Sequence, residues 1–455
     1  MKKVLVLGCA SLLVLVLAVF GYAAYLVRSL NTPEFRKTVL DRAEATVGTK
    51  VQVKEMDISV LSGITLKGVT VANPAPFPGD LMTADAFVLR YRLRPLLAGQ
   101  LEVERLALEK PTLNVLMDAK GGFNYEKLGG GAAAPAGGGA APAPDAASGS
   151  TASPIELVLK QLAVEDARIV MEDHTGAALM RMEDVDLDSS FKVASAGAGG
   201  SGTVKVATVS LADLMFLRGL SAPLEMTKET LSLAPIRAKL AGGDVAGDVK
   251  VDLKGFRYTA GLDVKGVRVK TLLEEAKSAR AVTGTLAAKA SFEGSGGLPT
   301  MKGKGRAEVA DCTVSNAPVF AAVAAALRVP ELKDPSFDQC LVEFTLANSR
   351  LQTPVVNLKG KQLQLTGKGT MHLVTSALNY DLNLALGTTL LEKIPVRELR
   401  AAFKDRGDGF SAIDFKVTGT SIAPQTDLAS KIGRAAATEA VKGGVDKLLK
   451  KKKLF

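Results

Sequence analysis

The segment YDLNLAL, residues 380–386, decides the fold class of this chain. Leu382, Leu384 and Leu386 are separated by single polar or small residues. Because successive side chains of a β-strand point to opposite faces of the sheet, this spacing predicts a strand with one apolar face and one polar face.

The same period-two pattern recurs in both halves of the chain. It is clear from Phe87 onward, from Val342 onward and from Ile413 onward. Counting weaker instances, such as those over 284–292 and 303–314, we expect about eighteen such strands. Many are separated by Gly, Asn or Asp, as in antiparallel hairpins. Open twisted sheets of more than about ten strands curl, split or flatten. The prediction is therefore a mainly β protein with an elongated, curled antiparallel sheet, a trough that is apolar inside. Two stacked β-sandwiches remain the alternative.

Helices are expected to be few. We predict one over 34–47, one over 270–280, one over 318–328 and a short one within 390–405. The third begins with Asn316 as a cap and Pro318 in its first turn. Residues 426–455 read as an amphipathic helix followed by a basic tail, which either lies on an anionic membrane surface or caps the last strands.

The N-terminus predicts a membrane anchor. Residues 4–27 contain no charged side chain, and as a helix they would be about 36 Å long, enough to cross a hydrocarbon core of about 30 Å. A cleavable signal peptide is the alternative, but its apolar region is normally shorter and ends in a recognisable cleavage site. We therefore expect residues 1–27 to be an uncleaved single-pass anchor in a bacterial inner membrane. The body would then lie in the periplasm.

A low-complexity tract divides the remaining chain. Residues 129–153 consist almost entirely of Gly, Ala, Pro and Ser, a composition that cannot bury enough apolar surface to order itself. We predict a flexible linker there. It would separate an N-terminal β region, 28–128, from a β-trough over 154–425.

Charge and composition argue against several classes of function. The net charge is +10, and it resides in residues 1–37 and 431–453, so no basic folded face is expected for nucleic acid. The chain has only two His residues and no Trp, and it carries no recognisable catalytic motif. We expect no enzyme activity, no metal and no cofactor. An anchored hydrolase would need a cluster of polar groups that nothing in the sequence predicts. Outside the anchor, Cys312 and Cys340 are the only possible disulfide pair; a bond and two buried thiols both remain open.

Two groups of segments resemble a known family. VTVANPAPFPG (69–79) and RYRLRPLLAGQLEVERLALEKPTLNVLMDAKGGFNYEKL (90–128) resemble the N-terminal region of the AsmA family of bacterial envelope proteins. KGRAEVADCTVSNAPVFAAVAAAL (304–327), LQLTGKGTMHLVTSALNYDLNLALG (363–387) and VTGTSIAPQTDL (417–428) are similar to its C-terminal region. The positions that carry the N-terminal resemblance are Val71, Asn73, Pro74, Phe77, Pro95, Leu96, Leu97, Gly99, Pro111, Asp118, Gly121, Asn124 and Tyr125.

The resemblance implies a membrane-anchored β-trough related to bridge-like lipid-transfer proteins. Such proteins work in phospholipid traffic between inner and outer membranes, with an outer-membrane or periplasmic partner at the distal end. The rival interpretation is a non-catalytic periplasmic scaffold that influences outer-membrane assembly through protein contacts.

The apolar strand faces are the candidate site. Their side chains would either shelter phospholipid acyl chains or form a packed core. The candidate lining residues are Phe87, Leu89, Tyr91, Leu93, Val342, Phe344, Leu346, Leu363, Leu365, Leu382, Leu384, Leu386, Ile413, Phe415 and Val417. Three arginines on one polar strand face, Arg90, Arg92 and Arg94, are candidates for phosphate headgroups, although a solvated charged strand is the commoner case.

Overall fold

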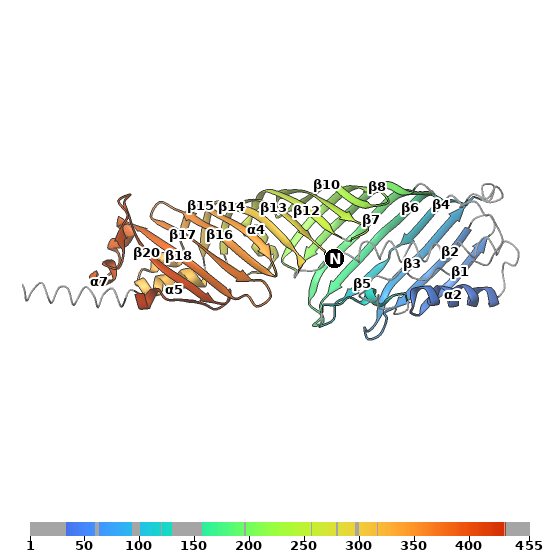
Figure 1. Cartoon of the computed structure of the whole chain (residues 1–455), viewed down its shortest axis with the longest axis horizontal. Coiled ribbons are helices and arrows are strands. Elements are labelled where there is room, and N and C mark those ends of the chain that lie inside the picture. The colour runs from blue at the N-terminus through green and yellow to red at the C-terminus, as the bar shows by residue number, and fades with distance from the viewer. Residues whose placement is uncertain are drawn as a thin grey trace, which may run out of the picture. The chain divides into compact units, whose positions relative to one another are not determined.

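The protein is mainly β, as predicted. The computed structural model describes residues 33–59, 63–92, 101–119, 121–129, 157–194, 197–255, 257–278, 281–295, 300–315, 317–431 and 433. These residues form 21 strands of a mixed, mostly antiparallel sheet with few helices (Figure 1). The chain divides into two compact units. Unit 1 comprises residues 1–238 and 248–258, and unit 2 comprises 239–247 and 259–455.

Unit 1 is built on successive strands that follow helix α2. The helix spans Pro33–Val47, in agreement with the predicted helix over 34–47. The strands are β1 (Val51–Ser59), β2 (Gly63–Ala72), β3 (Asp80–Tyr91), β4 (Leu101–Glu109), β5 (Thr112–Leu116), β6 (Leu157–Glu172), β7 (Ala178–Ala194), β8 (Gly197–Leu211) and β9 (Met215–Met226). A 3-10 helix, η1, spans Asn124–Lys127. Leu40 and Ala43 of α2 pack on a small core that contains Val51, Val71 and Leu81.

The predicted linker connects two strands that lie side by side. Both β4 and β5 pair with β6 in parallel, for example Leu106 with Leu162 and Leu113 with Ile169. This corrects the prediction of a purely antiparallel sheet. Two parallel strands need a long crossover, because the chain must return from the end of the first strand to the end of the sheet at which that strand began. Residues 129–153 provide that length within unit 1; residues 130–156 themselves lie outside the described part of the chain.

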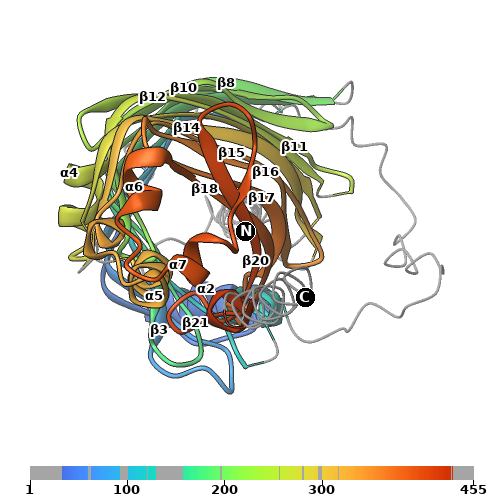
Figure 2. The same cartoon turned by 90° about the vertical axis from the view of Figure 1, so that its left-hand side faces the viewer.

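Three strands contribute residues to both units: β10 (Thr230–Leu240), β11 (Gly243–Asp252) and β12 (Tyr258–Arg268). Unit 2 continues with β13 (Ala281–Gly294), β14 (Lys302–Ser315), β15 (Ser336–Ala347), β16 (Arg350–Lys359), β17 (Leu363–His372), β18 (Leu378–Gly387), β19 (Lys404–Asp405), β20 (Phe410–Gly419) and β21 (Pro424–Thr426). Its helices are α4 (Val269–Glu275), α5 (Pro318–Leu327), η3 (Pro330–Lys333), α6 (Thr388–Glu392) and α7 (Arg397–Arg400). In Figure 2 strands β14–β18 and β20 form a curved wall, and α6 and α7 lie within its outline in this view.

Several local predictions need correction. Strands β9, β19 and β21 were not predicted, because β9 contains Gly219 and Pro223 and the other two are very short. Helix α5 begins at Pro318 as expected, but Ala317 occupies the cap position and no side chain caps the helix. The predicted C-terminal helix begins later than residue 426, since Thr426 ends β21 and the helical residues start at 428.

The predicted anchor over residues 4–27 lies outside the described residues. Within the part of the chain that is described, no helix combines the length and the apolar character that crossing a bilayer requires.

Candidate functional site

Most of the predicted lining residues of unit 2 lie in one packed core. Leu384 and Leu386 have no exposed surface, and Phe415 is 1% exposed. Eight predicted lining residues share this core: Leu363, Leu365, Leu382, Leu384, Leu386, Ile413, Phe415 and Val417. They lie in register across β17, β18 and β20, as in the row Leu365–Leu384–Ile413.

Helices and a 3-10 turn complete this core. Phe320, Val323 and Leu327 of α5 belong to it, as do Leu332 of η3 and Ile394, which follows α6. The Phe320 ring lies 5.8 Å from that of Phe337 on β15. An acyl chain would therefore reach Leu384 or Leu386 only if these segments moved away. We call this cluster the closed core, and the lining role of its members stays a prediction.

A second part of the same apolar sheet face is only half-buried. It includes two predicted lining residues, Val342 and Phe344, on β15. Leu346, next on the same face of β15, is buried. Rows of small and apolar side chains continue from β15 across β14 to β13, as in Val342–Ala307–Ala288 and Phe344–Gly305–Ala290. We call this surface the open face; its half-buried members are Leu286, Ala288, Ala290, Phe292, Ala307, Val309, Val342 and Phe344.

The strands over 284–292 and 303–314 were predicted, but none of their side chains was among the predicted lining residues. The inward positions of β13 and β14 are mostly Ala and Gly, with a few larger residues. The difference in hydropathy between their inward and outward faces is therefore small. The signal that was present is the strict alternation of exposed outward residues, such as Lys289, Ser291 and Lys304.

Two phenyl rings of the open face lie over glycines of β14. A Cβ atom added at Gly305 would lie 2.5 Å from Cζ of Phe344, and one at Gly303 would lie 2.5 Å from Cδ1 of Phe292. Each ring thus occupies the space that a side chain on the neighbouring strand would fill. The rings of Phe292 and Phe344 therefore lie over β14 at the two positions that lack a side chain.

The first prediction concerns this close approach. Gly305→Ala is expected to lower the stability of unit 2 by about 1–3 kcal/mol, because the added methyl group overlaps Phe344 and the Lys289 carbonyl oxygen. Hydrogen exchange of peptides from β14 and β15 measures the change. The matched control is Gly199→Ala in β8, where the nearest atom is 3.6 Å away. Equal exchange in the two variants would contradict the ring placement.

In unit 1 the predicted residues are mostly interior. Phe87 and Leu89 are buried in a core with Val103, and Tyr91 is half-buried. Arg90 is exposed. Arg92 lies 3.6 Å from the Glu102 carboxylate and 3.5 Å from that of Glu104. Leu93 and Arg94 lie outside the described residues.

One of the two carboxylates beside Arg92, that of Glu102, is shared with a further cation. Lys160 on β6 contacts Glu102, and this hydrogen bond holds the pKa of Glu102 below its usual value. Arg92 is thus part of a surface ion-pair network. Its contact with a headgroup, like those of Arg90 and Arg94, stays a prediction.

Two motif segments that are distant in sequence meet around the buried side-chain amide of Asn124 in unit 1. Nδ2 of Asn124 donates to Oδ1 of Asn73 at 2.7 Å and to the Asn114 carbonyl oxygen at 2.8 Å. Its Oδ1 accepts from the Tyr125 amide at 2.9 Å. Asn73 in turn donates to the Pro78 carbonyl oxygen at 2.6 Å. Asn124 therefore joins the turn over 73–79 to η1, which explains why Asn stands at both positions.

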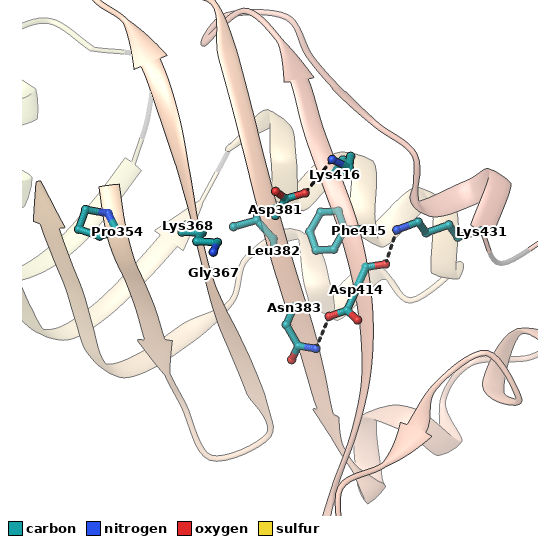
Figure 3. A pocket seen from close by; sticks show the side chains of 10 residues that line it. All are labelled: Pro354, Gly367, Lys368, Asp381, Leu382, Asn383, Asp414, Phe415, Lys416 and Lys431. Carbon is teal, nitrogen blue, oxygen red and sulfur yellow. Dashed lines mark hydrogen bonds and ion pairs between the residues drawn. The ribbon is translucent and has the colours of Figure 1, made fainter. Parts of the chain in front are cut away.

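A pocket of about 440 Å³ lies on β17, β18 and β20 (Figure 3). Lys416 pairs with Asp381 at 3.0 Å, and Asn383 donates to Asp414 at 2.8 Å. Lys431 donates to the Asp414 carbonyl oxygen at 3.2 Å and pairs with Asp427. These polar groups largely satisfy one another, as on a solvated strand face, and we assign no ligand to the pocket.

Cys312 and Cys340 are free thiols on the neighbouring strands β14 and β15. The two thiols are hydrogen-bonded to each other. This hydrogen bond lowers the pKa of Cys312. It raises the pKa of Cys340, and burial of Cys340 raises that pKa further. Among the described residues, no group of three or more His, Cys, Asp or Glu is placed to hold a metal ion.

Comparison with known proteins supports the N-terminal resemblance. The model of the AsmA family matches residues 1–229. No curated protein matches the chain, and neither does any solved structure. The similarity over 304–428 lies beyond the matched residues and stays a prediction. Since the match covers half of the 455 residues, from the N-terminus to the end of β9, the chain belongs to the AsmA family.

Proposed function

We propose that this protein carries phospholipid by sheltering acyl chains on the open face of unit 2. Residues 4–27 would anchor it in a bacterial inner membrane, with the body in the periplasm. The sheet would act as a trough that guides lipid between inner and outer membrane and so supports outer-membrane homeostasis. An outer-membrane or periplasmic protein at the distal end would be its partner.

The observation that carries the proposal is the half-buried apolar surface of β13–β15. Removing the apolar side chains of these three strands from water is favourable. Burial of an acyl chain on them contributes about 0.8 kcal/mol of stabilisation per CH₂ group. The rings of Phe292 and Phe344 lie against Gly303 and Gly305, so they offer contact area without obstructing the surface.

Membership of the AsmA family and a long β-sheet fit a bridge-like lipid-transfer role. No chemical step is needed for this function. Selectivity would come from the shape of the apolar face and from charges beside it, and the lipid headgroup would remain in water.

Site-specific crosslinking in the full-length protein tests the proposal. A photoreactive benzoylphenylalanine replaces Phe344 or Phe292 on the open face, and Thr345 or Ser291 on the outward face serves as the matched control. After irradiation of cells that express each variant, mass spectrometry identifies adducts. Phospholipid adducts at 344 and 292, but not at 345 and 291, would support acyl binding.

Lipid adducts at none of the four positions would overturn it. Protein adducts at the same positions would favour the scaffold interpretation, in which the sheet acts through protein contacts. Equal lipid labelling on both faces would also contradict the proposal, because it would show only proximity to a membrane.

The second prediction is a loss of lipid binding without loss of folding. Phe344→Glu places a carboxylate on the open face, and an acyl chain that covers it must remove the charge from water. We expect lipid adducts from a photoreactive residue at 292 to fall roughly tenfold or more. Thr345→Glu on the outward face is expected to leave them unchanged. Circular dichroism confirms folding, and equal labelling in both variants would contradict the prediction.

A further inference from the structure

Two apolar side chains of unit 2 are unusually exposed. Among the described residues, the most exposed large apolar side chains are Ile422 at 79% and Val374 at 71%. Neither belongs to a strand: Val374 lies in the turn between β17 and β18, and Ile422 lies in the turn between β20 and β21. Neither contributes to the closed core or to the open face.

The fold brings the two turns together. Strands β18 and β20 are hydrogen-bonded neighbours and antiparallel. The turn before β18 and the turn after β20 therefore lie at the same end of the strands, which we call this edge of the sheet. The Ser421 amide donates to the Ser376 carbonyl oxygen at 3.0 Å, and Ala377 forms an isolated bridge with Thr420. We call these two turns, residues 373–377 with Val374 and residues 420–423 with Ile422, the loop tip.

The third turn along this edge adds positive charge. The Leu373 amide donates to the Ser349 carbonyl oxygen at 2.9 Å, which joins the β15–β16 turn to the loop tip. Arg350, the first residue of β16, is exposed and lies in register with His372. On the other side of β15, Lys304 lies in register with Thr345, and Glu293 of β13 lies in register with Lys302 at the same end of the strands.

Negative charge is missing from the segments that form this edge. Residues 344–380 contain no Asp or Glu, and neither do residues 415–426. Four carboxylates flank these two segments. Glu343 pairs with Arg306 at 3.4 Å, Asp381 with Lys416 at 3.0 Å and Asp427 with Lys431 at 3.4 Å, while Asp414 accepts a hydrogen bond from Asn383 at 2.8 Å. The edge thus combines two exposed apolar side chains with the exposed guanidinium group of Arg350.

We infer that the loop tip inserts into an anionic lipid surface. Apolar side chains favour the boundary between headgroups and acyl chains, and nearby Arg and Lys favour anionic headgroups. Two side chains present far less area than the roughly 800 Å² per partner of a stable protein interface, which disfavours a protein as the occupant. The inference rests on the proposed function, since a lipid carrier must approach a bilayer to load or release its cargo.

Tryptophan fluorescence tests the inference directly, because the chain contains no Trp. Ile422→Trp and Val374→Trp each introduce a single reporter at the loop tip. Asp408→Trp, in the exposed turn before β20, reports from the opposite end of that strand. The full-length protein is held in zwitterionic nanodiscs, and vesicles that contain brominated lipids are added, with or without phosphatidylglycerol.

The expected result is a blue shift and quenching of both loop-tip reporters by the phosphatidylglycerol vesicles and a smaller effect of zwitterionic ones. The Asp408→Trp reporter should remain unquenched. Adding Arg350→Glu to Ile422→Trp should reduce the quenching. Unchanged emission at the loop tip, or equal quenching at position 408, would overturn the inference. Crosslinking at Phe344 is measured separately, so lipid adducts there without loop-tip insertion would refute this inference alone.

Discussion

Leu384→Ala is expected to lower the local stability of unit 2 by about 2–5 kcal/mol. Leu384 has no exposed surface, and it lies in register between Leu365 and Ile413 in the closed core. Truncation removes its contacts and leaves a cavity between the sheet and the helices. Hydrogen exchange of peptides from β17, β18 and β20 measures the effect, while peptides from β1–β7 of unit 1 should be unchanged.

Val374→Ala is the matched control, since Val374 is exposed and its truncation should change stability by less than about 0.5 kcal/mol. The comparison also bears on function. If Leu384→Ala were as mild as Val374→Ala, the helices would not cover β18 in solution. Leu384 would then be available as a lining residue, and the trough would extend farther along the sheet than the open face.

Asn124→Ala is expected to destabilise unit 1 by about 3 kcal/mol, because buried groups left without a partner each cost about 1–3 kcal/mol. The substitution removes donors from Asn73 and from the Asn114 carbonyl oxygen, and an acceptor from the Tyr125 amide. Faster hydrogen exchange should appear in peptides that cover the turn at 73–79 and η1 together, since Asn124 joins them.

Asn124→Asp separates the hydrogen bonds from simple loss of volume. It keeps the acceptor for Tyr125 but loses both donors, so it should remain clearly destabilising. Asn379→Ala in β18, an exposed position, serves as the control and should have little effect. If Asn124→Asp behaved like the native chain, the two donated hydrogen bonds would contribute nothing to the stability of unit 1.

Much of the fold could be predicted from local patterns. The period-two segments predicted the mainly β class because alternation depends only on backbone geometry. Helix α5 was predicted from Asn316 as a cap and Pro318 in the first turn, and of these two signals only Pro318 agrees with the structure. The parallel pairing of β4 and β5 with β6 was not predicted, since nothing in residues 101–116 or 157–172 encodes the direction of a partner strand.

The candidate site was predicted less completely. Leu384 and Phe344 have the same alternating context in the sequence, yet the structure buries the first under helices and leaves the second half-exposed. The small residues of β13 and β14 carried too little hydropathy contrast to be selected. Their importance appears only when Phe292 and Phe344 are seen over Gly303 and Gly305.

The sequence by itself therefore determined most of the strands, which of their side chains share a face, and membership of the AsmA family, because these properties reside in residues close together along the chain. Only the tertiary structure decided which parts of the apolar face are covered, how Asn73 meets Asn124, and that the turn of Val374 lies beside the turn of Ile422. Each of these depends on contacts between distant segments. Such contacts follow from packing over the whole unit, which no local pattern records.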